Sequence, residues 1–294
     1  MKYCKYIVIL ILNISPALAL TDSAYIQPYH QKFDIKIYSA RDFINMHEQE
    51  TDYKPNNPMQ LGVGIAVKNS ILNLGYAFNI GSRLNDELPR TKTFDFQLHH
   101  YGRKYMLDFY LQDYKGFYSD LWELKFYPKT QVLQIGAEGA YIFNGDRFSA
   151  RAAFSQTERQ LRSAGSFIVG GGTYFFRAKT ETADLSYLQF GGNFGYAYSY
   201  VINPHWFLSG SLTGGAYLSN RLGEKSVQVG ASFNMLPRLS GGYNTDKYCL
   251  YLLFMDNMHI FQNDLSFNTG TMQIVFIWRF EKIPFIDKFK NKKS

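Results

Sequence analysis

The residues best suited to chemistry gather in a polar run at 156–166, between stretches rich in aromatic residues. Glu158 is the one acidic residue of this run, and Arg151, Arg159 and Arg162 stand near it. Because a charge removed from water needs a partner, the sequence predicts that Glu158 pairs with one of these arginines, in a solvated loop or on a surface lining an internal lumen. A ring of such charges could instead form a constriction that selects ions or a ligand.

The same run holds two candidate nucleophiles, Ser163 and Ser166. Acyl transfer by a serine needs an imidazole base and a carboxylate that orients the base. His205 is a candidate for the base, and Glu158 or Asp95 for the carboxylate. The sequence has no nucleophile elbow and no fixed spacing that brings these residues together, so a catalytic site is the less favoured interpretation.

Two adjacent histidines, His99 and His100, are the other candidates for the base, and as a pair they suggest a metal site. Neighbouring residues of a strand point to opposite faces, so the two imidazoles cannot share one ion without a further element. The sequence therefore predicts no metal site, and no motif in it indicates a cofactor.

The element that gives these residues a context is a strand expected at 271–280. Side chains alternate across a strand, and one face here is entirely large and apolar: Met272, Ile274, Phe276, Trp278 and Phe280. Such a face could be buried against a second sheet in a soluble sandwich. It also suits the strand that closes a β-barrel in lipid, which is the hypothesis we adopt. We expect this strand to be recognised by the barrel assembly machinery.

The same alternation recurs along the chain and predicts an all-β fold, an antiparallel transmembrane β-barrel of about 12 strands, with a range of about 10 to 14. Asp95 and Asp108 fall on the polar faces of two such strands and are expected to line the lumen. An even strand number requires the segment around the glycines at 170–172 to be split into two strands. The longest loop is expected at 114–130.

The two ends of the chain are expected to lie outside the barrel. Lys2 and Lys5 precede a short apolar run that ends in a small-residue pattern, so residues 1–19 are predicted to be a secretory signal peptide. The barrel is expected to occupy residues 20–280. Residues 281–294 are expected to form a basic tail in the periplasm.

The net charge of +7 is concentrated at the ends of the chain rather than on a face of the barrel. No clustered Lys/Arg surface with interleaved aromatic residues appears between them, so nucleic acid is not an expected partner. Removal of the signal peptide takes away Cys4 and leaves Cys249 as the single cysteine, so no internal disulfide is expected in an oxidising compartment.

Several short runs, rich in aromatic and small residues, together resemble a known family. They are residues 114–118, 141–144, 148–154, 156–160, 163–167, 195–198 and 205–207. In these runs the chain resembles an uncharacterised outer-membrane β-barrel family of Gram-negative bacteria, a "domain of unknown function" family, over roughly residues 33–280. The resemblance implies a barrel fold and an outer-membrane location. It implies no activity, ligand or catalytic residue.

The sequence thus predicts an integral outer-membrane barrel in contact with outer-membrane lipid, either a small pore or a binding barrel for small solutes or lipids. Its most plausible lumen charges are Arg151, Glu158, Arg159, Arg162, Asp95 and Asp108. One alternative is an outer-membrane lipid hydrolase that uses a Ser/His pair. Another is a closed structural or adhesion barrel. The sequence favours a protein that is not an enzyme, and it leaves the oligomeric state open.

Overall fold

The computed structural model describes residues 21–31, 33–48, 50–57, 59–67, 73–80, 85–222, 228–261 and 265–281. The predicted signal peptide at 1–19 and the predicted tail beyond 281 lie outside the described residues. The elements are β1 (Ile26–Pro28), β2 (Phe33–Glu48), β3 (Thr51–Pro55), β4 (Met59–Val67), β5 (Asn73–Ile80), β6 (Lys92–Tyr101), β7 (Tyr105–Ser119), β8 (Lys125–Ile142), the π-helix η1 (Arg151–Ser155), β9 (Glu158–Gln160), β10 (Ala164–Lys179), β11 (Asp184–Val201), β12 (Trp206–Arg221), β13 (Gln228–Asn244), β14 (Tyr248–Ile260) and β15 (Leu265–Phe280).

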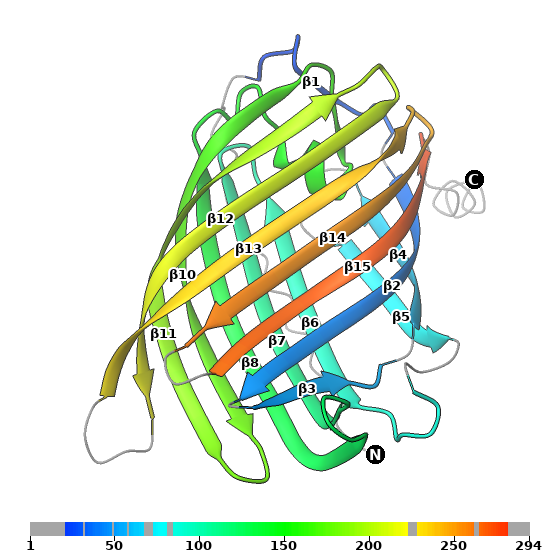
Figure 1. The fold of residues 1–294 in the computed structure, drawn as a ribbon. Helices are drawn as coiled ribbons and strands as arrows, with labels where there is room; N and C mark the ends of the chain where they lie inside the picture. The colour runs from blue at the N-terminus through cyan, green and yellow to red at the C-terminus, as the bar shows by residue number, and fades with distance from the viewer. Residues whose placement is uncertain are drawn as a thin grey trace, which may run out of the picture.

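Thirteen of these strands form one antiparallel sheet that closes on itself. The closure is the pairing of β15 with β2, which runs from Leu265 opposite Glu48 to Phe280 opposite Phe33. Ten strands make the closed ring, in the order β2-β3-β7-β8-β10-β11-β12-β13-β14-β15. The prediction of an all-β antiparallel barrel is therefore confirmed. Figure 1 shows β12 to β15 and β2 side by side, tilted across the barrel wall.

The remaining strands of the sheet, β4, β5 and β6, lie outside the closed ring and extend the wall at one end of the barrel. We call the end where β2 begins and β15 finishes the terminal end, and the opposite one the distal end. At the distal end β3 joins β2 directly to β7. Toward the terminal end, β4 and β5 extend the sheet from β2, and β6 extends it from β7. The predicted number of about 12 strands roughly fits this arrangement.

Two sequence predictions about this sheet are wrong. β10 is not split at its glycines, because they let neighbouring strands approach: a Cβ atom at Gly170 would lie 2.5 Å from the carbonyl oxygen of Gly139. The long loop expected at 114–130 is also absent, since β7 reaches Ser119 and β8 begins at Lys125. The aromatic residues assigned to that loop include Tyr114 and Phe117, which are buried inside the barrel.

Alternation along each strand separates an outer from an inner face. On β15 the outer face carries Met272, Ile274 and Trp278, each more than half exposed, and Phe276, which is 37% exposed. The predicted apolar face of the closing strand thus points away from the lumen. The intervening residues Val275, Ile277 and Arg279 are buried.

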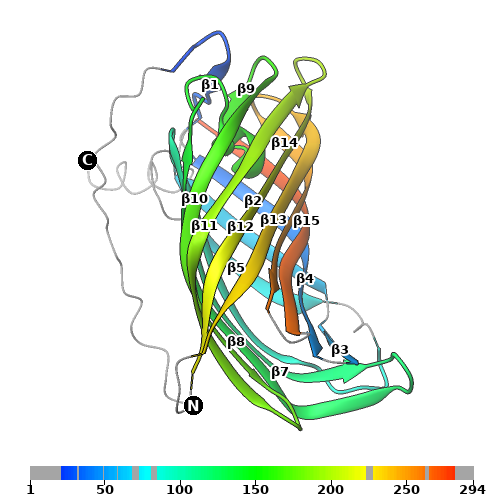
Figure 2. The ribbon, with the colours of Figure 1, turned by 60° about the vertical axis from the view of Figure 1, so that its left-hand side comes forward.

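The interior is filled by two clusters of buried side chains. The distal cluster includes Ile44, Met46, Tyr174, Phe176 and Phe267. The terminal cluster includes Tyr101, Ile142, Phe154, Tyr251 and Ile277. At the terminal end, η1 and the small β1–β9 sheet pack against the wall, and Figures 1 and 2 show β1 at this end. No helix in the described part of the chain is long and apolar enough to cross a membrane.

Candidate functional site: the closed lumen

An ion pair crosses the lumen between opposite walls. Asp108 on β7 and Arg238 on β13 are five strands apart in either direction around the ten-strand ring, so they stand on opposite walls. Arg238 Nη2 lies 2.5 Å from Asp108 Oδ2, and the two side chains are only 6% and 4% exposed. His99 Nδ1 lies 2.6 Å from the other carboxylate oxygen. This cluster, which we call the lumen clamp, ties three strands together across the interior.

A second polar group lies beside the lumen clamp and centres on Glu138. The hydroxyl of Tyr174 donates a hydrogen bond to this carboxylate, and Asn193 Nδ2 donates another over 2.7 Å. Asn193 Nδ2 also lies 3.2 Å from the hydroxyl of Tyr217. These residues come from β8, β10, β11 and β12, so one buried carboxylate organises four consecutive strands of the ring.

Aromatic side chains close the distal half of the lumen. Phe176 on β10 stacks on Phe267 of β15, with ring centroids 5.4 Å apart, although these strands also lie on opposite sides of the ring. His259 packs edge-on against Tyr174 and Phe176, at centroid distances of 4.7 and 4.5 Å. Side chains therefore meet across the lumen at this level as well as at the lumen clamp.

The polar run at 156–166 turns out to be part of a plug at the terminal end. Glu158 is buried, accepts a hydrogen bond from Ser149 Oγ at 2.8 Å and pairs with Arg103 at 2.7 Å. Its predicted partner Arg151 is also in contact, at 3.3 Å. The structure thus brings Glu158 and Arg151 together, and it adds Arg103, which the sequence reasoning did not single out.

The other two arginines of the predicted set lie at the rim instead of in the lumen. Arg159 Nη1 pairs with Asp246 at 2.9 Å and Nη2 donates to the carbonyl oxygen of Pro204, both in turns of the wall. Arg162 is exposed and lies over the ring of Tyr25. Residues of the short strand β9 face alternate sides, so only some of the charges in this run can point inward.

Arg279, on the inner face of the closing strand, fastens the plug to the wall. It donates to the carbonyl oxygen of Gln156 over 2.8 Å and to Asn244 Oδ1 over 3.1 Å. Its guanidinium also lies 3.7 Å from the ring centroid of Tyr29, just after β1. Burial raises the pKa of Tyr29 to about 12, with Arg279 opposing that rise, so the phenol is neutral at physiological pH.

The predicted Ser/His candidates are not brought together. Ser163 Oγ accepts a hydrogen bond from the amide of Val201 over 2.9 Å. Ser166 Oγ donates to the carbonyl oxygen of Phe167 and accepts from the amide of Asn144. His205 contacts the carbonyl oxygen of Asn244 through Nδ1. Each of these groups stabilises local backbone. No hydrogen bond between either serine and His205 occurs among the residues that the structure describes.

The remaining predicted lumen charge, Asp95, does lie inside the barrel. Its carboxylate accepts hydrogen bonds from the hydroxyl of Tyr114 over 2.5 Å and from the side-chain amides of Gln112 and Gln97 over 3.0 Å. Of the predicted set, Asp95, Asp108, Glu158 and Arg151 therefore have inward-directed contacts.

Comparison with known proteins places the chain in a family. The family described as "Domain of unknown function (DUF4421)" matches residues 21–280. The chain belongs to this family. The predicted membership of a family of unknown function is thereby confirmed. No curated protein sequence matches the chain.

Solved structures with a distant likeness to this family member include an outer membrane protein and a toluene transporter. A loop L8 deletion mutant of OmpT, an outer membrane protein of Vibrio cholerae, is 9% identical, with a TM-score of 0.24, over 83% of this chain and 99% of that one. The Pseudomonas putida toluene transporter TodX is 7% identical, with a TM-score of 0.25, over 88% and 90%. OccK11 (OpdR) of Pseudomonas aeruginosa is 6% identical, with a TM-score of 0.26, over 88% and 99%. Likeness at this level carries no functional inference.

The sequence reasoning missed three inward charges that organise this DUF4421 barrel: Glu138, Arg238 and Arg279. Glu138 and Arg238 occupy the polar faces of strands whose other faces are apolar, with Gln134 and Asn234 as neighbours on those faces, whereas Arg279 follows the apolar residues Val275 and Ile277 on the inner face of β15. The signal was therefore present in the alternation. What the alternation could not give is the partner across the lumen, because that depends on the order of strands around the ring.

Proposed function

We propose that the chain is an integral outer-membrane β-barrel of a Gram-negative cell that keeps its lumen closed and binds small solutes or lipids, and does not conduct ions. The predicted signal peptide at 1–19 agrees with a secreted protein. The terminal end would face the periplasm, because the connections β6–β7, β11–β12 and β13–β14 are short there, as periplasmic turns of bacterial barrels are, and the long connection between β8 and β10 folds back as the plug.

The outer face of β10 to β13 supports the membrane location. Large apolar side chains follow one another there without intervening charges, and each is more than half exposed: Phe167, Phe190, Phe194, Leu208, Leu212, Leu218, Val229 and Leu239. A soluble monomer rarely exposes so continuous an apolar surface, whereas a lipid-facing barrel wall requires one.

The Asp108–Arg238 contact is the observation that argues against conduction. An ion pair between opposite walls, buried on all sides, leaves no room for a hydrated ion to pass at that level. The Phe176–Phe267 stack blocks the distal half independently. The interior of an eight-strand barrel is just wide enough for side chains to fill it. A ring of ten strands is somewhat wider, and long aromatic side chains can fill its lumen in the same way.

Conductance across a planar lipid bilayer tests this proposal. The full-length protein, folded in detergent and shown by a heat-dependent gel shift to be a barrel, is expected to give no steady ion conductance. A variant in which residues 146–162 are replaced by a short Gly/Ser turn should also be silent, because the lumen clamp and the distal aromatic cluster remain. Steady conductance from the wild-type protein would overturn the proposal.

A further inference from the structure

Three side chains at the distal end point out of the barrel from neighbouring strands: His47 on β2, Asp52 on β3 and Ser266 on β15. Their outward direction follows from alternation, since the adjacent residues Met46 and Phe267 are 1% and 2% exposed and belong to the distal cluster. The side chains of His47 and Asp52 are 45% and 42% exposed. These three groups can therefore be reached from outside the barrel.

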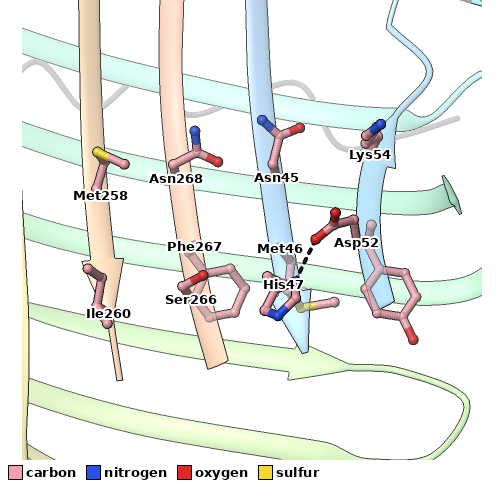
Figure 3. Close-up of a pocket in the computed structure, with 11 residues that line it drawn as sticks. Asn45, Met46, His47, Asp52, Lys54, Met258, Ile260, Ser266, Phe267 and Asn268 are labelled. Atoms are coloured by element: carbon pink, nitrogen blue, oxygen red, sulfur yellow. Dashed lines mark hydrogen bonds and ion pairs between the residues drawn. The ribbon is translucent and has the colours of Figure 1, made fainter. Parts of the chain in front are cut away.

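The imidazole stands between the carboxylate and the serine. His47 Nδ1 lies 2.6 Å from Asp52 Oδ1, which directs Nε2 away from the carboxylate. Ser266 is the residue directly opposite His47 in the β15–β2 pairing, where Cβ atoms are about 4.5–5.5 Å apart. Figure 3 shows His47 between Ser266 and Asp52.

The Ser266 hydroxyl and His47 Nε2 are both available for this contact. Neither atom takes part in a hydrogen bond within the described part of the chain. Rotation of Ser266 about χ1 can turn its hydroxyl toward the imidazole. Nucleophile–base hydrogen bonds are commonly loose in free enzymes and tighten when substrate binds.

The surroundings offer room for a lipid and donors for a developing charge. The three residues line an open pocket of about 540 Å³, which also contains Met258 and Ile260 as apolar surface. Asn45 and Asn268, opposite each other in the same pairing, carry side-chain amides on this face of the sheet. Amide N–H groups of this kind stabilise the oxyanion of a tetrahedral intermediate.

We propose that Ser266, His47 and Asp52 form a hydrolytic site for the acyl ester of a membrane lipid, on the outer face of the barrel at its distal end. This proposal rests on the membrane location proposed above, which brings the ester groups of the outer leaflet to this height of the wall. It adds a reaction to a barrel whose lumen takes no part in it.

The reaction would proceed in two balanced steps. Ser266 Oγ attacks the ester carbonyl carbon while His47 Nε2 takes its proton; the ester C–O bond then breaks, and the imidazolium returns the proton to the leaving lipid alkoxide. Water next attacks the acyl-serine, losing a proton to His47, and the serine oxygen leaves with that proton. The products are a free fatty acid and a lipid with one acyl chain fewer. Asp52 is a positioning residue that holds the tautomer and orientation of His47.

The second His–Asp contact of the molecule does not offer the same chemistry. His99 and Asp108 are as close as His47 and Asp52, but Asp108 is also bound to Arg238 inside the closed lumen. No lipid ester can reach that pair while the lumen clamp is formed.

The test is release of fatty acid by the folded, full-length protein from vesicles of phosphatidylethanolamine and, in a second arm, of lipid A. Release in either arm is expected and identifies the source of the ester. Ser266→Ala and His47→Gln should each lower it by roughly 10²–10⁴-fold. Ser163→Ala and His205→Gln are matched controls that should retain it, because their contacts with Val201, Asn244, Arg159 and Tyr243 lie at the opposite end of the barrel.

A serine-reactive fluorophosphonate supplies a readout that does not depend on the substrate. It should attach to Ser266 in the wild-type protein, as located by peptide mass, and fail to attach in His47→Gln. A folded, ion-silent barrel that releases no fatty acid in either arm, or a label on another serine, would overturn this proposal and leave the proposed closed barrel standing. Failure of the gel shift or steady conductance would count against the closed barrel instead.

Discussion

The lumen clamp and the outer His47–Asp52 pair are two clusters of similar chemistry in opposite surroundings. Both join a histidine to an aspartate over 2.6 Å. Inside, Arg238 occupies the second oxygen of the carboxylate and the cluster is almost fully buried. Outside, the side chains of His47 and Asp52 are nearly half exposed. The third residue there is Ser266, which lies opposite the histidine, whereas Arg238 binds the aspartate. The same pair helps to close the lumen where both oxygens of the carboxylate have a partner, and under our proposal it acts on a substrate where His47 Nε2 is left without one among the described residues.

The largest expected effect comes from breaking the inner cluster. Arg238→Ala leaves the Asp108 carboxylate buried without its cation, which should lower the free energy of unfolding by about 3–5 kcal/mol. Urea unfolding in detergent, followed by the gel shift, measures this. The double variant Asp108→Leu/Arg238→Met is the control, since an apolar pair of similar volume should recover most of the loss. A loss below about 1 kcal/mol in the single variant would show that the clamp is solvated.

A smaller loss of folding free energy is expected when an arginine is placed on the outer face. The loss should be larger in the middle of the apolar wall than beside the outer His47–Asp52 cluster. Leu212 lies on the outer face in the middle of β12, where a charge would stand in hydrocarbon, so Leu212→Arg should cost about 2–4 kcal/mol. Asn45→Arg near the distal end of β2 should cost about 0–1 kcal/mol, because it stands near the interface. Refolding into lipid vesicles measures both. Equal costs would contradict the membrane placement.

The outer cluster itself should contribute little to folding. Asp52→Asn removes the carboxylate from an exposed hydrogen bond, and exposed contacts of this kind contribute about 0–1 kcal/mol, so the unfolding free energy should change by less than about 1 kcal/mol. The same variant should reduce fatty-acid release, because the His47 tautomer is no longer fixed. The two measurements on one preparation distinguish a working site from a structural contact. Loss of stability together with activity would make the pair structural.

The smallest effect is expected at the end of the chain. Truncation after Phe280 should leave assembly into the outer membrane unchanged, because the strand proposed to be read by the assembly machinery, with Met272, Ile274, Phe276, Trp278 and Phe280, stays intact. Outer-membrane fractionation with the gel shift checks this. Failure to assemble would move that role into the segment after residue 280.

Much of the fold could be predicted because strand alternation is a local property. The outward apolar face of β15 and the inward positions of Asp95 and Asp108 follow from period-2 patterning alone. The split of β10 and the loop at 114–130 were wrong for a shared reason. Glycine and aromatic residues resemble turn and loop signals in a sequence, but in this barrel they serve close strand contact and lumen filling.

The candidate sites could be predicted less well. The sequence singles out the polar run at 156–166 as unusual, and in the structure Glu158 contacts Arg151. The sequence suggested a loop, a constriction or a catalytic run for these residues. It did not predict that η1 and β9 fold back against the barrel wall. The sequence could not predict that Ser266 lies beside His47 and Asp52, since Asp52 and Ser266 are 214 positions apart along the chain.

The sequence by itself determined the all-β class, the inner and outer faces of strands such as β15 and the resemblance to the family, but not every strand boundary. Those features depend on neighbouring residues and on the period of a strand. Only the tertiary structure decided which residues lie together: Asp108 in contact with Arg238 across the lumen, and Ser266 opposite His47 on the outside. Both meetings depend on closure of the ring through β15 and β2, and pairing between strands so distant in sequence is set by the whole barrel rather than by any local pattern.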